Sequence, residues 1–253
     1  MTLNIVVFVI GLIFGSFLNV LVHRIPLQIS LFKPLGSVCT QCESKIKWYE
    51  NIPVFSYIFL KGKCSNCRDT ISILYPLIEI LTASVTLILF RNYWLNMELI
   101  LTILLFYNLI VLSFIDFKYR AVPDYLLIIA VIIALLIGDL KNILLFAGGF
   151  VLLELFITFY IQNIKAKITK NKALESQAAL GEGDIPIVAV IGGILGIHLG
   201  ISAIFLAALL ALLPALYNLI SKKEIETAFI PFLSLGLFIT LITEFNIFSF
   251  FSY

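Results

Sequence analysis

Charged residues are scarce in this 253-residue chain: Asp, Glu, Lys and Arg make up 13% of it, against 61% hydrophobic residues. Soluble domains carry about a quarter charged residues, so this composition excludes an ordinary soluble protein. The formal net charge is only +2 and gives no reason to expect nucleic acid as a partner. Polar and apolar residues do not alternate in the long apolar stretches, which excludes a membrane β-barrel. We therefore predict an all-α polytopic membrane protein.

Apolar runs long enough to cross a bilayer recur along the whole chain. A spanning helix needs roughly 20 mostly apolar residues. No basic residue precedes the first run and no small-residue cleavage pattern follows it, which favours a retained helix over a removed signal peptide. We predict about eight membrane helices, over residues 2–22, 73–90, 98–115, 125–138, 142–162, 185–199, 200–219 and 229–251.

Basic residues are nearly absent from every second connection between these helices. Of the 17 Lys and Arg residues, only Arg91 and Lys141 lie in the connections after the second, fourth and sixth segments. The positive-inside rule then places the other connections in the cytoplasm and both chain ends outside. Membrane lipid, including anionic lipid, is the partner that this charge distribution predicts.

All four cysteines lie in one predicted cytoplasmic loop, residues 23–72. They form two C-x-x-C pairs, Cys39 with Cys42 and Cys64 with Cys67, with 21 residues between the pairs. Two such pairs complete a zinc-ribbon-like site of four thiolates, which leaves no open position on the ion and therefore suits a structural zinc. Disulfides or free thiols are the alternatives, and a reducing compartment disfavours disulfides.

The segment between the two cysteine pairs is aromatic and amphipathic, with the sequence "KWYENIPVFSYIFLKGK". Two interpretations remain equally open at this point. The segment is either a small folded insert lying on the membrane surface or a docking surface for a substrate.

Polar side chains inside the predicted helices mark candidate sites, because ionisable groups are costly in lipid. Glu79 and Glu154 lie within helices, and Asn19 lies in the first one. We interpret Glu154 as pairing within the bundle, whereas Asn19 either bonds across a helix interface or belongs to a site. Gly11 and Gly15 form a small-xxx-small face that favours close helix packing.

Two aspartates are expected at the same membrane depth. Asp116 ends a helix that runs inward, and Asp184, in "GEGD", begins a helix that runs outward. A helical bundle can therefore bring them together although they are distant in sequence. Asp124 follows Pro123 and is interpreted as an N-cap. Glu182 is interpreted as a loop charge.

Neighbouring carboxylates suit general acid–base hydrolysis, because one retains a proton while the other activates water. A helix N-terminus favours the ionised form of Asp184, which we predict to be the base. The C-terminal end of its helix favours the protonated form of Asp116, the predicted acid. Gly181 and Gly183 have no Cβ and let a substrate backbone approach closely.

The motifs, taken in order, resemble the type IV prepilin peptidase family, the bifunctional leader peptidases and N-methyltransferases of pilus and type II secretion systems. The resemblance covers nearly the whole chain. It implies that Asp116 and Asp184 are the proteolytic pair and that Asp124 is not. The motifs are "GSFLNVLVHRIP", "CTQC", "IKWYENIPVFSY", "KGKCSNC", "ISILYPLIEILTA", "IDFKYRAVPD", "GEGD" and "IGGILG".

The resemblance also implies two reactions on type IV prepilins or type II secretion pseudopilins. A basic leader is cleaved after a Gly at the cytoplasmic face of the bacterial inner membrane. S-adenosylmethionine then donates a methyl group to the new N-terminal amine, commonly that of Phe. No glycine-rich dinucleotide fingerprint is present to locate the cofactor.

A division of labour follows from the same resemblance. It links methylation to residues 1–90, with the loop 23–72, and cleavage to a six-helix peptidase domain at residues 91–253. The cofactor-binding candidates that it implies are Gly15, Asn19, His23, Arg24 and Glu79.

Three positions depart from the family pattern, and two other functions compete with it. Glu43 and Arg68 follow the cysteine pairs where Gly is usual, and Pro186 stands two residues after Asp184 where Lys is common. A presenilin-like intramembrane protease shares G-x-G-D but places its first Asp deep in a helix. A transporter or assembly scaffold would relay ions through the same acids, yet it has no need of the four-cysteine loop.

Overall fold

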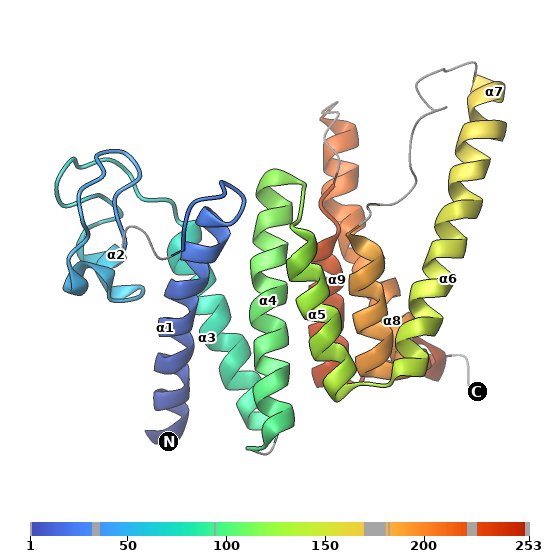
Figure 1. The fold of residues 1–253 in the computed structure, drawn as a ribbon, viewed down its shortest axis with the longest axis horizontal. Helices are drawn as coiled ribbons and strands as arrows, with labels where there is room; N and C mark the ends of the chain where they lie inside the picture. The colour runs from blue at the N-terminus through green and yellow to red at the C-terminus, as the bar shows by residue number, and fades with distance from the viewer. Residues whose placement is uncertain are drawn as a thin grey trace. The chain divides into compact units, whose positions relative to one another are not determined.

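The computed structural model describes residues 2–31, 36–93, 95–169, 181, 183–221 and 227–250. These residues form helices and connections, with two isolated β-bridges and no strand among them, so the predicted all-α class is confirmed (Figure 1). The elements are α1 (Thr2–Arg24), η1 (Trp48–Asn51), α2 (Phe55–Phe59), α3 (Leu74–Asn92), α4 (Met97–Tyr119), α5 (Asp124–Ile137), α6 (Leu140–Phe159), η2 (Tyr160–Lys165), α7 (Ala166–Thr169), α8 (Asp184–Ile220), α9 (Ile230–Thr243) and η4 (Ile247–Phe250).

Five of the described helices are long and apolar enough to cross a membrane, and α5 and α9 are shorter apolar helices. The five are Thr2–Arg24, Leu74–Asn92, Met97–Tyr119, Leu140–Lys165 and Asp184–Asn218. Several charged residues of the sequence argument lie outside the described residues, namely Lys33, Lys170, Lys172, Glu182, Lys222 and Lys223.

The chain forms two compact units, Met1–Pro123 and Asp124–Tyr253. In the first unit α1 packs along α3, and α4 packs against both. In the second unit α8 packs against α5, α6 and α9. The functional division predicted between residues 90 and 91 falls inside the first unit, in the last turn of α3, and it stays a prediction.

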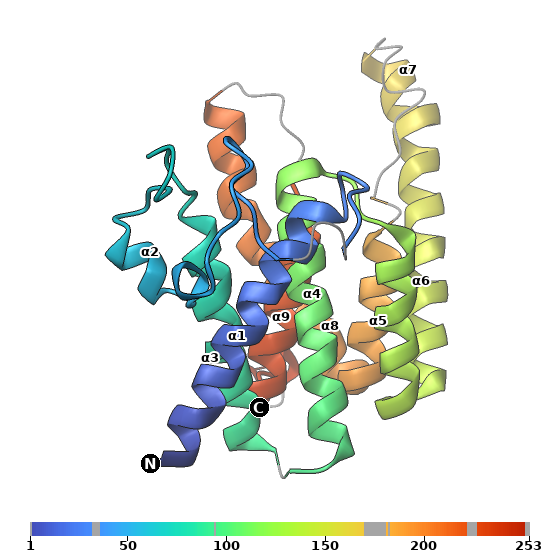
Figure 2. The ribbon, with the colours of Figure 1, turned by 60° about the vertical axis from the view of Figure 1, so that its left-hand side comes forward.

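Two glycines let α1 lie directly against α3. A Cβ on Gly11 would stand 2.6 Å from the Cα of Ala83, and a Cβ on Gly15 would stand 2.6 Å from the Cα of Glu79. Both distances are too short for a real side chain, so the backbones touch at these positions. The predicted small-residue face is therefore a helix contact (Figure 2).

The single element α8 contains the two helices predicted over residues 185–199 and 200–219. Gly196 interrupts it with a φ of 73° and a ψ of −170°, a conformation that suits only glycine. A Cβ on Gly200 would lie 3.5 Å from the Cα of Gly192, whereas eight residues of straight helix span about 12 Å. The chain therefore reverses direction at Gly196, slightly earlier than predicted.

The last apolar helix is shorter than predicted. Its apolar content predicts an end at residue 251, but α9 ends at Thr243. Glu244 follows in the left-handed conformation, with a φ of 52°, and its N–H bonds to the Thr240 carbonyl. The left-handed conformation of Glu244 thus ends the helix, which apolar content alone did not predict.

Candidate functional site

Two turns of the same geometry carry the cysteine pairs in the connection between α1 and α3, residues 25–73, which we call the insert. The first cysteine of each pair donates its N–H to the carbonyl five residues later, Cys39 to Ser44 at 3.0 Å and Cys64 to Asp69 at 2.8 Å. An antiparallel β-bridge closes each turn. The two halves are therefore structurally equivalent, as expected of a zinc ribbon.

The donor set formed by the four cysteines fits a tetrahedral metal ion. Their Sγ atoms all lie within 4.8 Å of one another, and those of Cys39 and Cys67 are 3.8 Å apart. Zinc–sulfur bonds of about 2.3 Å require tetrahedral sulfur atoms roughly 3.8 Å apart. None of the four cysteines forms a disulfide in the structure.

Each turn closes without the glycine that is usual in the family. Glu43 and Arg68 adopt φ angles of 55° and 61° and donate their N–H groups to the carbonyls of Cys39 and Cys64. The left-handed conformation costs a residue with a Cβ about 1–2 kcal/mol. The side chains at these two positions therefore strain the turns but do not prevent them.

Hydrogen bonds favour the ionised form of two thiols. The Ser44 hydroxyl, 3.1 Å from Cys42 Sγ, lowers the pKa of the Cys42 thiol to about 6. Backbone N–H groups of Cys67 and Asn66 lower the pKa of the Cys64 thiol. The thiolate is the form that ligates a metal ion.

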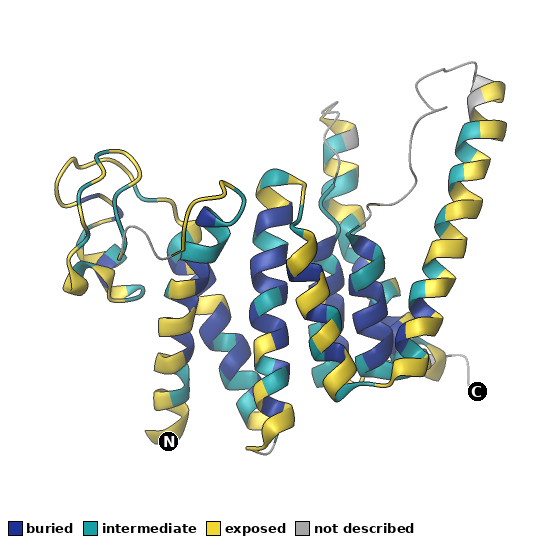
Figure 3. Cartoon of the chain, viewed as in Figure 1, coloured by how far each residue is buried: buried dark blue, intermediate teal, exposed yellow. Residues whose placement is uncertain are grey.

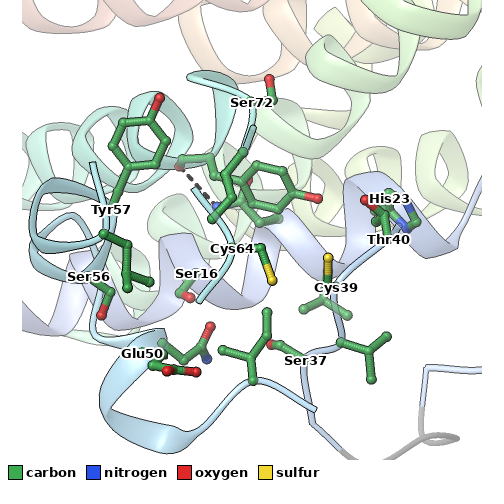
Figure 4. A pocket seen from close by; sticks show the side chains of 18 of the residues that line it. Ser16, His23, Ser37, Cys39, Thr40, Glu50, Ser56, Tyr57, Cys64 and Ser72 are labelled. Atoms are coloured by element: carbon green, nitrogen blue, oxygen red, sulfur yellow. Dashed lines mark hydrogen bonds between the residues drawn. The ribbon is translucent and has the colours of Figure 1, made fainter. Parts of the chain in front are cut away.

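A cavity of about 450 Å³ lies between the insert and the membrane helices of the first unit (Figure 4). Cys39 and Cys64 belong to its wall, so the four-cysteine cluster borders the cavity directly. The wall also carries ionisable and hydroxyl groups from three helices and the insert. They include Ser16, Asn19, His23, Arg24, Glu50, Tyr57, Tyr75, Glu79 and Lys118.

Glu79 joins α3 to the insert. Its carboxylate is buried and accepts the N–H of Val54 at 2.7 Å, and the Ser16 hydroxyl also bonds to it. Val54 itself has a φ of 62° and a ψ of −49°, and the N–H of Phe55 donates to the Pro53 carbonyl at 2.6 Å. This is a γ-turn with positive φ, which is strained for a β-branched residue. The bond to Glu79 holds that turn beside the cavity.

Asn19 and Gly15 connect α1 to α3 in the same region. The buried Asn19 side chain donates to the Tyr75 carbonyl at 3.1 Å, which ties the end of α1 to the start of α3. Gly15 meets the backbone of Glu79, as described above. Asn19 thus both bonds across a helix interface and lines the cavity.

Arg24 organises the chain that leaves α1. Its buried guanidinium donates to the carbonyls of Ser30, Leu31 and Gly36 at 2.9 to 3.1 Å. Such bonds position the loop, so the Arg24 side chain shapes one wall of the cavity. His23, its neighbour, lines the cavity as well (Figure 4).

Asp116 and Asp184 are each buried at a helix end, and each belongs to a different compact unit. Asp116 lies in the last turn of α4, where Arg120 ends the helix in the left-handed conformation. Asp184 begins α8, and its Oδ2 accepts the N–H of Gly181 at 3.3 Å. Gly183 lies in the turn between Gly181 and Asp184. The pairing of Asp116 with Asp184 across the two units stays a prediction.

Asp124, Glu154 and His198 are more exposed than Asp116 and Asp184. Asp124 is the first residue of α5 and is exposed, in keeping with a helix-start role. Glu154 is partly exposed on α6. His198 stacks edge-on with Phe248 at a centroid distance of 5.5 Å, which is a structural contact.

Ser16, Lys118 and Val54 contribute to the cavity, yet the sequence argument did not single them out. Ser16 lies three residues before Asn19, so a helical period could have placed it on the same face. Lys118 is close to Asp116 in sequence, but only the packing of α4 against α1 and α3 reveals that it lines the cavity. No sequence signal indicates the γ-turn at Val54.

Two known protein-family models match consecutive parts of the chain. Residues 9–93 match the Bacterial Peptidase A24 N-terminal domain, and residues 103–216 match the Type IV leader peptidase family. No solved structure matches the chain.

Several curated relatives are similar to this chain over most of their length. A "Prepilin leader peptidase/N-methyltransferase" of Neisseria gonorrhoeae is 30% identical, over 90% of this chain and 86% of its own. Proteins of the same name from Bacillus subtilis and Vibrio cholerae are 30% and 31% identical, over 90% and 75% of this chain and 88% and 76% of their own. The resemblance noted in the sequence is therefore confirmed. The chain belongs to the type IV leader peptidase family and is an enzyme, a membrane peptidase and N-methyltransferase.

Proposed function

We propose that this enzyme removes the leader of type IV prepilins or type II secretion pseudopilins and then methylates the new N-terminal amine. The relatives' shared name supports both reactions and the prepilin substrate. Cleavage after a Gly, at the cytoplasmic face of a bacterial inner membrane, is part of the proposal. The positive-inside distribution supports that face and, as part of the proposal, an outside location for both chain ends.

Asp116 and Asp184 carry the cleavage in this proposal. The observation that supports it most is that both carboxylates are buried at helix ends, where helix dipoles act on them in opposite senses. Asp184, at an N-terminus and bonded to the Gly181 N–H, takes the proton of the attacking water. Asp116, at a C-terminus, protonates the departing amine. Gly181 and Gly183 admit the substrate backbone beside Asp184.

The cavity beside the insert is the proposed site of methylation. S-adenosylmethionine, when bound, supplies a methyl group on a positively charged sulfonium. The buried carboxylate of Glu79 would attract that charge, and Asn19 and His23 offer polar groups to the cofactor and the amine. Gly15 and Arg24 support the site by holding α3 and the loop after α1.

A structural zinc ion is proposed for Cys39, Cys42, Cys64 and Cys67. Four thiolates satisfy a tetrahedral ion and leave no open position, so the ion would hold the insert together rather than take part in either reaction. Because two of these cysteines line the cavity, the metal centre would also shape the site of methylation.

Product masses test the two activities together. Purified enzyme in lipid is incubated with a full-length prepilin, with and without S-adenosylmethionine. We expect trimmed product in both reactions and the added mass of a methyl group only in the reaction with the cofactor. Intact prepilin in both reactions, from well-folded enzyme, would reject the proposed substrate.

A further inference from the structure

In the short helix α2 the apolar side chains are exposed and the polar one is buried. Phe55, Ile58 and Phe59 are 58%, 65% and 82% exposed, whereas Ser56 is buried. A surface helix in water buries its apolar side chains and exposes its serine. The three exposed residues recur at helical spacing on one face, which we call the α2 face (Figure 3). This inversion requires an apolar environment around the helix.

The position of α2 relative to α3 is fixed by the bond between Glu79 and Val54, the residue just before α2. Glu79 lies five residues inside α3, or about 7 Å along the helix axis. All 19 residues of α3, about 28 Å, are needed to span a hydrocarbon core of about 30 Å. The residue bonded to Glu79 therefore lies below the start of the span, not above it.

The start of the α3 span also exposes apolar side chains. Ile73, Leu77 and Ile80, at the start of α3, are 62%, 48% and 46% exposed. Figures 1 and 2 both show α2 beside the upper parts of α1 and α3 rather than beyond their ends. Exposed lysines flank the segment on both sides, Lys45 and Lys47 before it and Lys61 and Lys63 after it.

We propose that the α2 face is immersed in the bilayer at the boundary between headgroups and acyl chains, so that the insert is anchored in lipid. Interfacial helices lie about 5–10 Å deep, which agrees with the depth of Glu79. Trp48 and Tyr49, 81% and 48% exposed just before α2, belong to residue types enriched at membrane interfaces. The flanking lysines reach the headgroups from this depth. This inference does not depend on either proposed reaction.

Tryptophan fluorescence tests the immersion directly. The chain has two tryptophans, so Trp48→Phe and Trp94→Phe give a background without indole. Phe59→Trp then reports on the α2 face. Gln41→Trp is the matched control, because Gln41 is exposed between the cysteines of the first turn. Both proteins are placed in vesicles of phosphatidylethanolamine and phosphatidylglycerol, with or without phosphatidylcholine brominated on its acyl chains.

Brominated lipid should abolish most of the emission of the Phe59→Trp protein, and acrylamide in the water should remove little of it. The Gln41→Trp control should show the opposite order. If both indoles respond to acrylamide alike and neither responds to brominated lipid, the α2 face is not in the bilayer. Protection of the Phe59→Trp indole only after a prepilin peptide is added would also overturn the proposal, in favour of peptide docking. Ile58→Trp replaces Phe59→Trp should that protein not fold.

Discussion

Glu79 and Asp184 are both buried carboxylates, yet the chain positions them by different means. Asp184 bonds to Gly181, three residues away, at the start of its own helix. Glu79 lies inside a helix and bonds to Val54, 25 residues away in the insert. The bond from Gly181 to Asp184 is therefore local, whereas the bond from Val54 to Glu79 depends on the folding of a separate segment. The two sites should respond differently to changes in the insert.

The largest expected effect concerns the aspartates. Asp116→Asn or Asp184→Asn should reduce the rate of prepilin cleavage by about 100-fold or more, because each removes a group that transfers a proton. Either protein should still methylate a pilin already trimmed to its mature N-terminus, since neither carboxylate moves the methyl group. Mass spectrometry of both products measures the two rates.

Asp124→Asn is the control for that prediction, because Asp124 is exposed and begins a helix. It should keep cleavage near the unchanged rate. Equal inactivity of the three folded variants would contradict the assignment of the pair. Loss of methylation of trimmed pilin by Asp116→Asn would show instead that the two sites are one.

Loss of the metal centre should affect the insert and spare the aspartates. The purified enzyme should contain about one zinc per chain, and Cys64→Ser should lose it, because structural zinc sites supply roughly 10–16 kcal/mol of apparent binding energy. Methylation should fall with the zinc content while cleavage persists. Metal analysis and the two activity assays check this. Two disulfides in freshly prepared protein, or equal loss of both activities, would contradict it.

Glu79→Gln tests how far methylation depends on the charge of one side chain that bonds to the insert. The amide keeps an oxygen for the Val54 N–H but removes the charge, and a hydrogen bond to a charged group is worth about 1.5–3 kcal/mol. Methylation of trimmed pilin should fall about 10- to 100-fold, with cleavage unchanged. A parallel measurement of zinc content separates this effect from unfolding of the insert. Unchanged methylation would remove Glu79 from the proposed site.

The same contrast explains how far the sequence could predict the structure. Long apolar runs predicted the helices, and C-x-x-C spacing predicted the clustered thiols, because both signals are local. Asp184 could be placed at a helix start for the same reason. The bonds from Asn19 to Tyr75 and from Val54 to Glu79 join segments far apart in sequence, and nothing in "ENIPVF" indicates a positive φ. The sequence therefore did not predict the cavity, which is formed by the folded insert and the helices beside it.

The smallest expected effect concerns the strained turns of the metal centre. Glu43→Gly and Arg68→Gly should each stabilise the insert by about 1 kcal/mol at most, because relief of the left-handed conformation is partly offset by the greater freedom of Gly in the unfolded chain. Thr40→Gly, in the first turn at a residue without positive φ, should instead destabilise it by roughly 0.5–1 kcal/mol. The measurement is the guanidinium midpoint of zinc release, followed with a chromogenic chelator. A lower midpoint for both Glu43→Gly and Arg68→Gly would mean that their side chains contribute contacts that outweigh the strain. Opposite shifts for these two and for Thr40→Gly would show that the backbone conformation, not the mere presence of Gly, sets the stability of each turn.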